Sequence, residues 1–471
     1  MRILENVKPK AVMRYFEDIC AIPHGSGNTD AISDYFIKEA EKLGLWAIKD
    51  EHNNVVIKKA ASKGYENHPT VILQAHLDMV CEKEAWCDID FLKDSISIKA
   101  EGDFISACGT TLGGDDGIGV AMIMAVLEDD TLKHPPIEAV FTSDEETGMF
   151  GAAGLSAEHI SGRRMINIDS EQEGVFTVSC AGGARAEIKI PFEREALSTP
   201  LYELTLCGLK GGHSGVEIDK GRYNSNVLMG KFLSSICGDF RIADIFGGTK
   251  DNAIPARTVC VVSTELDITS LAESFVSENK TAEEPELKID VRQVSDKHTA
   301  FTPRDSRKIA EFLSSVKNGV QAFSRDIEGL VETSLNLGCL KTEGNEINAV
   351  FSVRSSVNTA KENLLEDLKK SALAFGGNIT VGGHYPAWEY KKDSRLRDVM
   401  VEQYESVSGK KPIVEAIHAG LECGLFSEKI SGLDAVSFGP DMFDIHTPSE
   451  RLSISSVERS YAFLLKVLEN L

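Results

Sequence analysis

The chain has 471 residues and a formal net charge of −23 at pH 7. This length predicts two domains rather than one, and 42% hydrophobic with 26% charged residues is typical of a globular protein in water. The strong negative charge argues against nucleic acid and anionic membranes as partners.

Cysteine usage and the N-terminal residues indicate a reducing compartment. Ten cysteines are scattered along the chain without a CxxC pair, and the opening residues MRILENVKPK do not resemble a signal peptide. No apolar run reaches the 18 or so residues that a membrane span needs. We therefore expect a cytoplasmic protein with reduced thiols and no membrane partner.

The first part of the chain predicts helices followed by strands. Apolar periodicity predicts a helix over Lys8–Cys20 and a second helix that starts after Thr29, with Thr29 as its N-cap. A hairpin is predicted over Trp46–Lys58, and Ser95–Lys99 alternates like a half-exposed strand.

The strand predicted at Val71–Val80 carries two chemically active side chains at its end. Residues two apart on a strand point to the same face, so His76 and Asp78 should project together. This arrangement pairs an imidazole ligand with a carboxylate that can orient it or share its site.

A pair of acids precedes a helix that is apolar on all sides. Asp115 and Asp116 follow two glycines, and Gly117–Leu127 predicts a buried helix. A plain N-cap is the alternative interpretation for one of the two aspartates.

Three further apolar strands lead into acids or a histidine. Ligands of open α/β sheets bind beyond the carboxyl ends of the strands, so these side chains are predicted to share one site with His76. The three are Ile137–Ser143 before Glu145 and Glu146, Met165–Ile168 before Asp169, and Ala435–Phe438 before His446.

The pattern of predicted secondary structure changes between about residues 185 and 385. Short strands alternate there with amphipathic helices, which is typical of an α+β domain with an antiparallel sheet. We therefore predict a discontinuous α/β domain at residues 1–184 and 386–471, with a mixed central sheet flanked by helices. Residues 185–385 form the inserted domain.

The histidines and acids of the first domain make a donor set that suits Zn²⁺, with Mn²⁺ or Co²⁺ as substitutes. So many acids would repel one another without cations, and two metals that share one carboxylate use the whole set. Metals about 3.5–4 Å apart can activate a water molecule for hydrolysis. Of the adjacent Glu145 and Glu146, one can bind a metal while the other moves the proton of that water.

Six segments, HLDMV, LGGDDGIG, TSDEETG, NIDSE, KGGHSG and DIHTPSE, together resemble the co-catalytic di-zinc peptidases, which include peptidase T and carboxypeptidase G. Within that family the sequence is most similar to the aminoacyl-histidine dipeptidases, also called Xaa-His or cytosol non-specific dipeptidases. The resemblance covers essentially the whole chain. It implies hydrolysis of unblocked dipeptides, of the Xaa-His type or with broad specificity, by a hydroxide that bridges two metals.

The same resemblance implies a complete set of metal ligands. His76 and Asp169 would bind one zinc, Glu146 and His446 would bind the other, and Asp115 would bridge the two.

Three further features near the metals are implied by the resemblance. Glu145 would be the general base, and Asp78 would orient the imidazole of His76. The peptide bond between Asp115 and Asp116 is expected to be cis.

The inserted domain is implied to be a lid and a dimerisation domain. In relatives, the histidine that matches His213 reaches the active site of a partner subunit and polarises the scissile carbonyl, so a homodimer is expected. Asn252, Arg354 and Gly420 match positions that hold the C-terminal residue of the substrate, and Arg354 can pair with its α-carboxylate. The alternatives are a histidine in a plain glycine turn and an arginine on a strand surface.

Three other functions are compatible with parts of this pattern. An amide hydrolase of another specificity, such as a deacylase or a tripeptidase, would use the same centre. A non-catalytic metal-binding dimeric scaffold would need no spare base such as Glu145. Phosphate binding by the loop at Gly113-Gly114 is disfavoured, because two acids follow it and no P-loop lysine does.

Overall fold

The structure is a computed structural model that describes residues 2–197, 199–295, 297 and 299–471. Internal contacts divide the chain into two units. Unit 1 comprises Met1–Ser179, Tyr390–Ala416 and Leu421–Leu471, and unit 2 comprises Cys180–Glu389 and Ile417–Gly420. The predicted domain boundaries, after residue 184 and before residue 386, lie near these divisions.

Unit 1 is organised on a mixed sheet with the strand order β1-β2-β6-β3-β7-β23-β8-β22. The central strands β6, β3, β7 and β23 are parallel, whereas β1 and β2 pair antiparallel with their neighbours. β3 is buried along its whole length, as expected for a central strand with both faces covered. The strands are β1 (Trp46–Lys49), β2 (Val55–Lys59), β3 (Val71–His76), β6 (Ile137–Thr142), β7 (Arg164–Asn167), β8 (Val175–Cys180), β22 (Ile413–Ile417) and β23 (Asp434–Ser437).

Helices cover this sheet, and the most buried of them is α3 (Gly114–Glu128). Every residue from Gly117 to Leu127 is buried, which confirms the predicted core helix. α3 packs on α1 and on β3, while α9 packs on β23. The other helices are α1 (Lys10–Cys20), α2 (Asp30–Lys42), α4 (Phe150–Gly154), the short 3-10 helix η1 (Ala157–His159), α9 (Arg395–Ser408), α10 (Glu422–Lys429) and α11 (Ile454–Asn470).

A small antiparallel sheet with the order β24-β25-β5-β4 completes unit 1. Its hairpin of β24 and β25 encloses the loop that carries His446. The strands are β4 (Ile98–Glu101), β5 (Phe104–Ala107), β24 (Met442–Phe443) and β25 (Arg451–Ser453).

Two local predictions in unit 1 are wrong in detail. The strand predicted from Ser95 begins only at Ile98, because the Ser95 hydroxyl and the Ile96 N–H bind carbonyls at the end of α1 and just beyond it. Thr29 occupies the N-cap position of α2, but its backbone is already helical and its side chain does not cap the helix.

Unit 2 contains a larger sheet with the order β16-β11-β15-β13-β19-β20-β9-β21, and β18 also pairs with β19. All of these pairings are antiparallel, as predicted for the inserted region. The strands are β9 (Gly182–Pro191), β11 (Leu201–Cys207), β13 (Arg241–Gly247), β15 (Thr258–Ser263), β16 (Lys288–Val294), β18 (Gly319–Phe323), β19 (Val331–Glu343), β20 (Glu346–Ser355) and β21 (Asn378–Tyr385).

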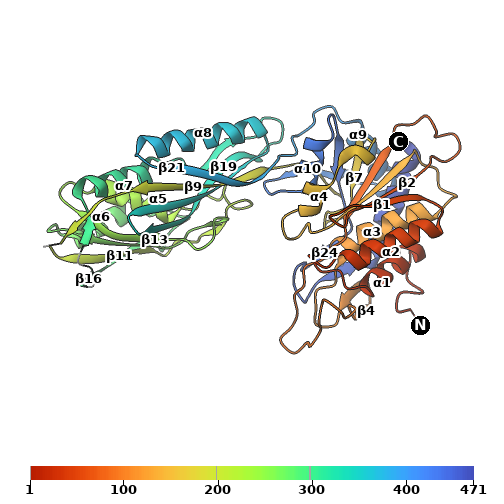
Figure 1. The fold of residues 1–471 in the computed structure, drawn as a ribbon, viewed down its shortest axis with the longest axis horizontal. Helices are drawn as coiled ribbons and strands as arrows, with labels where there is room; N and C mark the ends of the chain where they lie inside the picture. Colours follow the sequence, from red (N-terminus) through yellow and green to blue (C-terminus); the bar gives the residue numbers. More distant parts are fainter. Residues whose placement is uncertain (1, 198, 296, 298) are drawn as a thin grey trace. The chain divides into compact units, whose positions relative to one another are not determined.

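The helices of unit 2 lie along this sheet, as Figure 1 shows for α7 and α8. Two short pairs of strands lie outside the large sheet. The helices are α5 (Ser225–Ser235), α6 (Ile268–Asn279), α7 (Pro303–Ser315) and α8 (Asn358–Ala374), and the short strands are β10 (Arg194–Ala196), β12 (Gly212–His213), β14 (Ala253–Ile254) and β17 (Thr299–Phe301). Within the described residues, no helix has both the length and the apolar character that a bilayer span requires.

Candidate active site

The parallel strands of unit 1 end at one edge of the sheet, and a predicted site residue stands at or beyond each end. β3 ends at His76, β6 leads into Glu145 and Glu146, and β7 is followed by Asp169. β23 leads into the hairpin that carries His446. Because parallel strands gather their carboxyl ends, these residues from distant parts of the sequence meet in space.

Asp115 lies between the two histidines. Its Oδ1 is 3.1 Å from Nε2 of His76, and its Oδ2 is 3.3 Å from Nε2 of His446. The backbone of Asp115 is not helical (φ −83°, ψ 106°), and the bond to Asp116 is cis, a feature that the family resemblance implied. The two oxygens of one carboxylate thus face two different imidazoles.

Each imidazole has a second acid beside it. Oδ1 of Asp169 is 3.5 Å from Nε2 of His76, and Oε1 of Glu146 is 2.9 Å from Nε2 of His446. Among the described residues, three groups of side chains could each hold a metal ion, because the donor atoms within each group lie within 4.8 Å of one another. The groups are His76, Asp116 and Asp169; His76, Glu145 and Glu146; and Asp115, Glu146 and His446.

The acids of this cluster have unusual affinities for protons. Burial, together with the charge of nearby acids, raises the pKa of Glu145 to about 9 and that of Asp169 to about 6. Hydrogen bonds to Asp115 and Glu146 raise the pKa of His446 to about 10. Carboxylates that are so crowded favour bound cations, and two imidazoles with three carboxylates fit a pair of Zn²⁺ ions.

The carboxylate of Asp78 organises the Glu145 segment more directly than it orients His76. Nδ1 of His76 is 2.9 Å from the backbone oxygen of Asp78 and 3.6 Å from its Oδ1. The Asp78 carboxylate accepts hydrogen bonds from the backbone N–H of Glu145 (2.9 Å) and Glu146 (3.3 Å) and from the hydroxyl of Ser26 (2.7 Å). Asp78 therefore helps to position both the imidazole of His76 and the backbone of Glu145 and Glu146.

Asp116 is fully buried and its carboxylate binds backbone groups. Its Oδ2 accepts a hydrogen bond from the N–H of His76 (3.2 Å), and its Oδ1 accepts one from the N–H of Gly119 (3.2 Å). Burial and the charge of Asp169 raise its pKa well above the usual value. Asp116 thus joins the first turn of α3 to the end of β3.

His213 lies in unit 2, on the short strand β12, which pairs with β14. Its Nδ1 accepts hydrogen bonds from the backbone N–H groups of Gly215 (3.2 Å) and Val216 (3.3 Å). These contacts assign the ring proton to Nε2. Burial and the charge of Arg354 lower the pKa of His213, so the ring is neutral and offers Nε2–H as a donor.

Arg354 lies on β20, opposite Ser334 of β19. Its guanidinium donates to the hydroxyl of Tyr385 (3.1 Å), and among the described residues its buried Nε has no hydrogen-bond partner and no carboxylate pairs with it. Nε2 of His418 is 2.7 Å from the Ser334 hydroxyl, and burial with the charge of Arg354 lowers the pKa of His418 to about 4. Arg354 thus gives this part of unit 2 a positive charge and, among the described residues, an Nε–H donor without an acceptor.

The other two predicted substrate-binding residues also belong to unit 2. The backbone oxygen of Asn252 accepts a hydrogen bond from the N–H of Ser214 (2.9 Å), next to His213. Gly420 ends the four-residue stretch of unit 2 that starts at Ile417. The predicted metal ligands therefore lie in unit 1, and the predicted substrate residues lie in unit 2.

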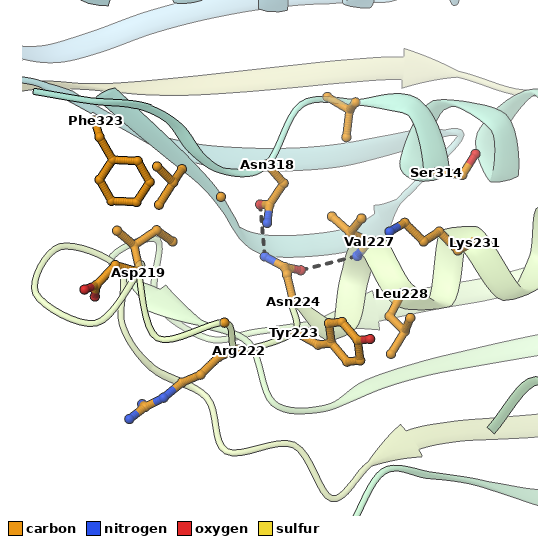
Figure 2. Close-up of a pocket in the computed structure, with 15 residues that line it drawn as sticks. Asp219, Arg222, Tyr223, Asn224, Val227, Leu228, Lys231, Ser314, Asn318 and Phe323 are labelled. Atoms are coloured by element: carbon orange, nitrogen blue, oxygen red, sulfur yellow. Dashed lines mark hydrogen bonds between the residues drawn. The ribbon is translucent and has the colours of Figure 1, made fainter. Parts of the chain in front are cut away.

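A cavity of about 500 Å³ in unit 2 contains none of the predicted site residues in its lining. Figure 2 shows Asn224 in this cavity, where its side chain accepts from the N–H of Val227 and donates to Asn318. Asn224 thereby caps α5, and Arg222 pairs with Glu217 at 2.7 Å. Asn224 therefore holds the start of α5 in place.

Glu422 is absent from the site predicted from sequence, although it is fully buried against β3 and β6. Its Oε2 accepts hydrogen bonds from Nε2 of Gln74 (2.6 Å) and from the hydroxyl of Thr142 (2.7 Å), and burial raises its pKa to about 8. Gln74 in turn accepts from Asn167. The sequence signal for this buried polar group was Gln74. It is a polar residue on an otherwise apolar strand, and its side chain shares a face with that of His76 two positions later.

Comparison with known families identifies the class of protein that this fold and site define. Residues 72–470 match the model of peptidase family M20/M25/M40. The chain belongs to this family and is a peptidase, which sets aside the non-catalytic scaffold.

Individual relatives agree with this assignment over the full length. The chain is 35% identical over 482 aligned residues to the cytosol non-specific dipeptidase of Escherichia coli (strain K12), covering 100% of this chain and 99% of that protein. The crystal structure of aminoacylhistidine dipeptidase from Vibrio alginolyticus superposes with a TM-score of 0.96 at 36% identity, covering 99% and 98% of the two chains. Aminopeptidase PepT from Bacillus cereus, at 15% identity and a TM-score of 0.59 over 98% of each chain, shares the fold.

Proposed function

We propose that this protein hydrolyses unblocked dipeptides with the help of two bound metal ions, Zn²⁺ by preference. The observation that carries the proposal is Asp115, whose two carboxylate oxygens face the imidazoles of His76 and His446. The names of the two full-length relatives, a non-specific dipeptidase and an aminoacylhistidine dipeptidase, support dipeptides as the substrate class.

The ligands divide into two sites with one shared member. His76 and Asp169 would hold one metal, Glu146 and His446 the other, and Asp115 both. The short distances between Asp169 and His76 and between Glu146 and His446 support these pairs. When bound, the two metals supply Lewis acidity that activates a water molecule and stabilises the oxygen anion formed from the peptide carbonyl.

Glu145 is the proposed general base. It lies just beyond the end of β6, and its backbone N–H donates to the Asp78 carboxylate, which holds Glu145 beside the five proposed ligands. The two cations would lower the raised pKa of Glu145, so that its side chain would be an ionised carboxylate. It would take one proton from the attacking water and deliver it to the amine that leaves, which returns the carboxylate to its starting state.

The substrate-binding part of the proposal concerns unit 2. The guanidinium of Arg354 would bind the free α-carboxylate of the dipeptide, with Asn252 and Gly420 beside the C-terminal residue. The neutral ring of His213, with its proton on Nε2, would donate to the scissile carbonyl in the site of a second subunit. The protein would therefore be a homodimer that is joined through unit 2, which would also act as a lid.

We further propose that the protein is cytoplasmic. All ten cysteines are among the described residues, and no disulfide bond joins any of them there. The full-length relative from Escherichia coli carries the word cytosol in its name.

A metal and substrate panel tests the proposed function. The purified protein is analysed for bound metal and assayed on Ala-His, an N-acetyl amino acid and a tripeptide, before and after chelation. We expect two metals per chain, preference for Ala-His, loss of activity on chelation and recovery with Zn²⁺. A strong preference for the acylated substrate or for the tripeptide would instead indicate a deacylase or a tripeptidase.

A further inference from the structure

A buried carboxylate, that of Glu450, fills the glycine loop that precedes α3. Its Oε2 accepts hydrogen bonds from the backbone N–H groups of Leu112 (2.7 Å) and Gly113 (3.2 Å). Its Oε1 accepts from the N–H groups of Gly114 (2.8 Å) and Asp115 (3.4 Å). Four successive N–H groups thus converge on one side chain that is only 3% exposed.

The loop has the geometry of an anion-binding nest. Gly113 has a left-handed backbone (φ 73°), and a Cβ at Gly114 would lie 3.1 Å from Oε1 of Glu450, so the second glycine lets the carboxylate approach closely. The anion that this loop holds is therefore a carboxylate of the chain itself. This explains physically why the loop is not a phosphate site.

Glu450 also belongs to the hairpin that carries His446. The hairpin runs from β24 to β25, and within it Asp444 (φ 54°) and His446 (φ 59°) both have left-handed backbones, which is unfavourable for residues with a side chain. The N–H of Glu450 donates to the backbone oxygen of Thr447 at 3.1 Å. Such a loop keeps its shape only if its surroundings hold it.

We propose that Glu450 is a positioning residue for the metal site formed by Asp115, Glu146 and His446. One carboxylate joins the loop of Asp115 to the hairpin of His446, so it sets the separation of these two ligands. This inference rests on the proposed two-metal function. It predicts that loss of Glu450 weakens the metal at His446 more than the metal at His76.

The chain offers a matched control in Glu138. This carboxylate is 2% exposed and accepts hydrogen bonds from the N–H groups of Ser161 (2.9 Å) and Gly162 (2.9 Å), with Lys58 at 3.1 Å. It stands near the start of β6, whereas Glu145 and Glu146 follow the end of that strand. Glu138→Gln removes a comparable loop anchor without touching the ligands.

The test is calorimetric titration of the metal-free proteins with Zn²⁺, alongside melting temperatures and steady-state kinetics. For Glu450→Gln we expect one site near wild-type affinity and the other weakened about 10- to 100-fold. Its kcat should fall at low zinc and recover partly at high zinc, while KM changes little. Glu450→Asp, which keeps the charge, should restore part of the affinity and serves as the test variant if the amide does not fold. Glu138→Gln should lower the melting temperature and leave both affinities unchanged.

Three results would overturn this inference. Wild-type affinities at both sites of Glu450→Gln would remove the positioning role while leaving the two-metal function intact. An equal loss in Glu138→Gln would show that general destabilisation is responsible. A wild-type protein that binds fewer than two metals would overturn the two-metal function as well.

Discussion

The two units assemble their site residues by different physical means. In unit 1 the parallel strands β3, β6, β7 and β23 bring their carboxyl ends to one edge, so residues far apart in sequence meet there. In the antiparallel sheet of unit 2, the carboxyl ends of neighbouring strands lie at opposite ends of the sheet. Arg354 lies near the end of the strand β20, while His213 lies on the short strand β12, which pairs with the distant β14. A parallel sheet therefore gathers a site through its topology, whereas an antiparallel one needs its faces and loops.

The electrostatics of the two sets of residues are opposite. Burial and the charge of nearby acids raise the pKa of Glu145 and Asp169 in unit 1, and burial with the charge of Arg354 lowers the pKa of His213 and His418 in unit 2. The first arrangement favours cations and the second favours an anion. The proposed dipeptide substrate would use both properties, since it carries a free carboxylate and a peptide carbonyl that would meet the metals.

The largest effect is expected from Glu145→Gln, which removes the base but none of the proposed ligands. We expect kcat on Ala-His to fall about 10³-fold, because general-base catalysis contributes on that order. Metal content should stay at the wild-type value, whereas Glu146→Gln should lose metal as well as activity. A fully active, metal-loaded Glu145→Gln enzyme would refute the mechanism.

Metal removal should affect the stability of unit 1 but not that of unit 2. A ligand present at about 1,000 times its Kd stabilises the state that binds it by about 4 kcal/mol. Chelation should therefore increase amide hydrogen exchange in β3, β6 and α3 of unit 1 and leave β13 and β15 of unit 2 unchanged. An equal increase in all five elements would contradict the assignment of the metals to unit 1 alone.

Acid should destabilise the protein through His418 of unit 2. Its folded pKa of about 4 lies below the ordinary value of 6.5, so the unfolded chain takes up the proton first. The contribution of neutral His418 to the free energy of unfolding is fully present above pH 6.5 and is lost as the pH falls through 4. Its upper limit is about 3 kcal/mol. Urea unfolding at a series of pH values should show a flatter profile for His418→Gln, and the exposed His68→Gln should behave like the wild type.

The smallest change is expected from Arg354→Met. Loss of a charge-assisted pair costs about 2 kcal/mol, so kcat/KM on Ala-His should fall about 30-fold. The rate on the C-terminal amide of the same dipeptide should change little, because the amide lacks the carboxylate. Arg292→Met, which breaks a surface pair with Glu203, is the control. An equal loss on both substrates would argue against carboxylate recognition.

The sequence was sufficient for the fold class and for the strand ends, because both depend on local periodicity. The buried strand before His76 and the core helix after Asp116 are visible in short windows of residues. Contacts between residues that are far apart in the sequence are not visible in such windows. Leu112 and Glu450 are 338 residues apart, and no local pattern connects a glycine loop with a distant acid.

The residues of unit 2 show a second limit of sequence reasoning. Arg354 stands within an ordinary alternating strand, so its pattern alone fits a surface arginine equally well. Only the resemblance singled it out, and the missing acidic partner became visible in the structure. Likewise, the preference of the Asp78 carboxylate for the backbone of Glu145 depends on loop geometry that residue spacing does not encode.

The position of β23 in the sheet has a consequence for biosynthesis. β23 lies between β7 and β8, yet its first residue, Asp434, is made roughly 270 residues after β7 ends at Asn167. At about 5–20 residues per second, the ribosome leaves that edge of β7 unpaired for about 10–50 s. An open edge strand is a template for aggregation, so the nascent chain depends on protection during this interval. Because His446 is made later still, the proposed metal site would be complete only near the end of synthesis.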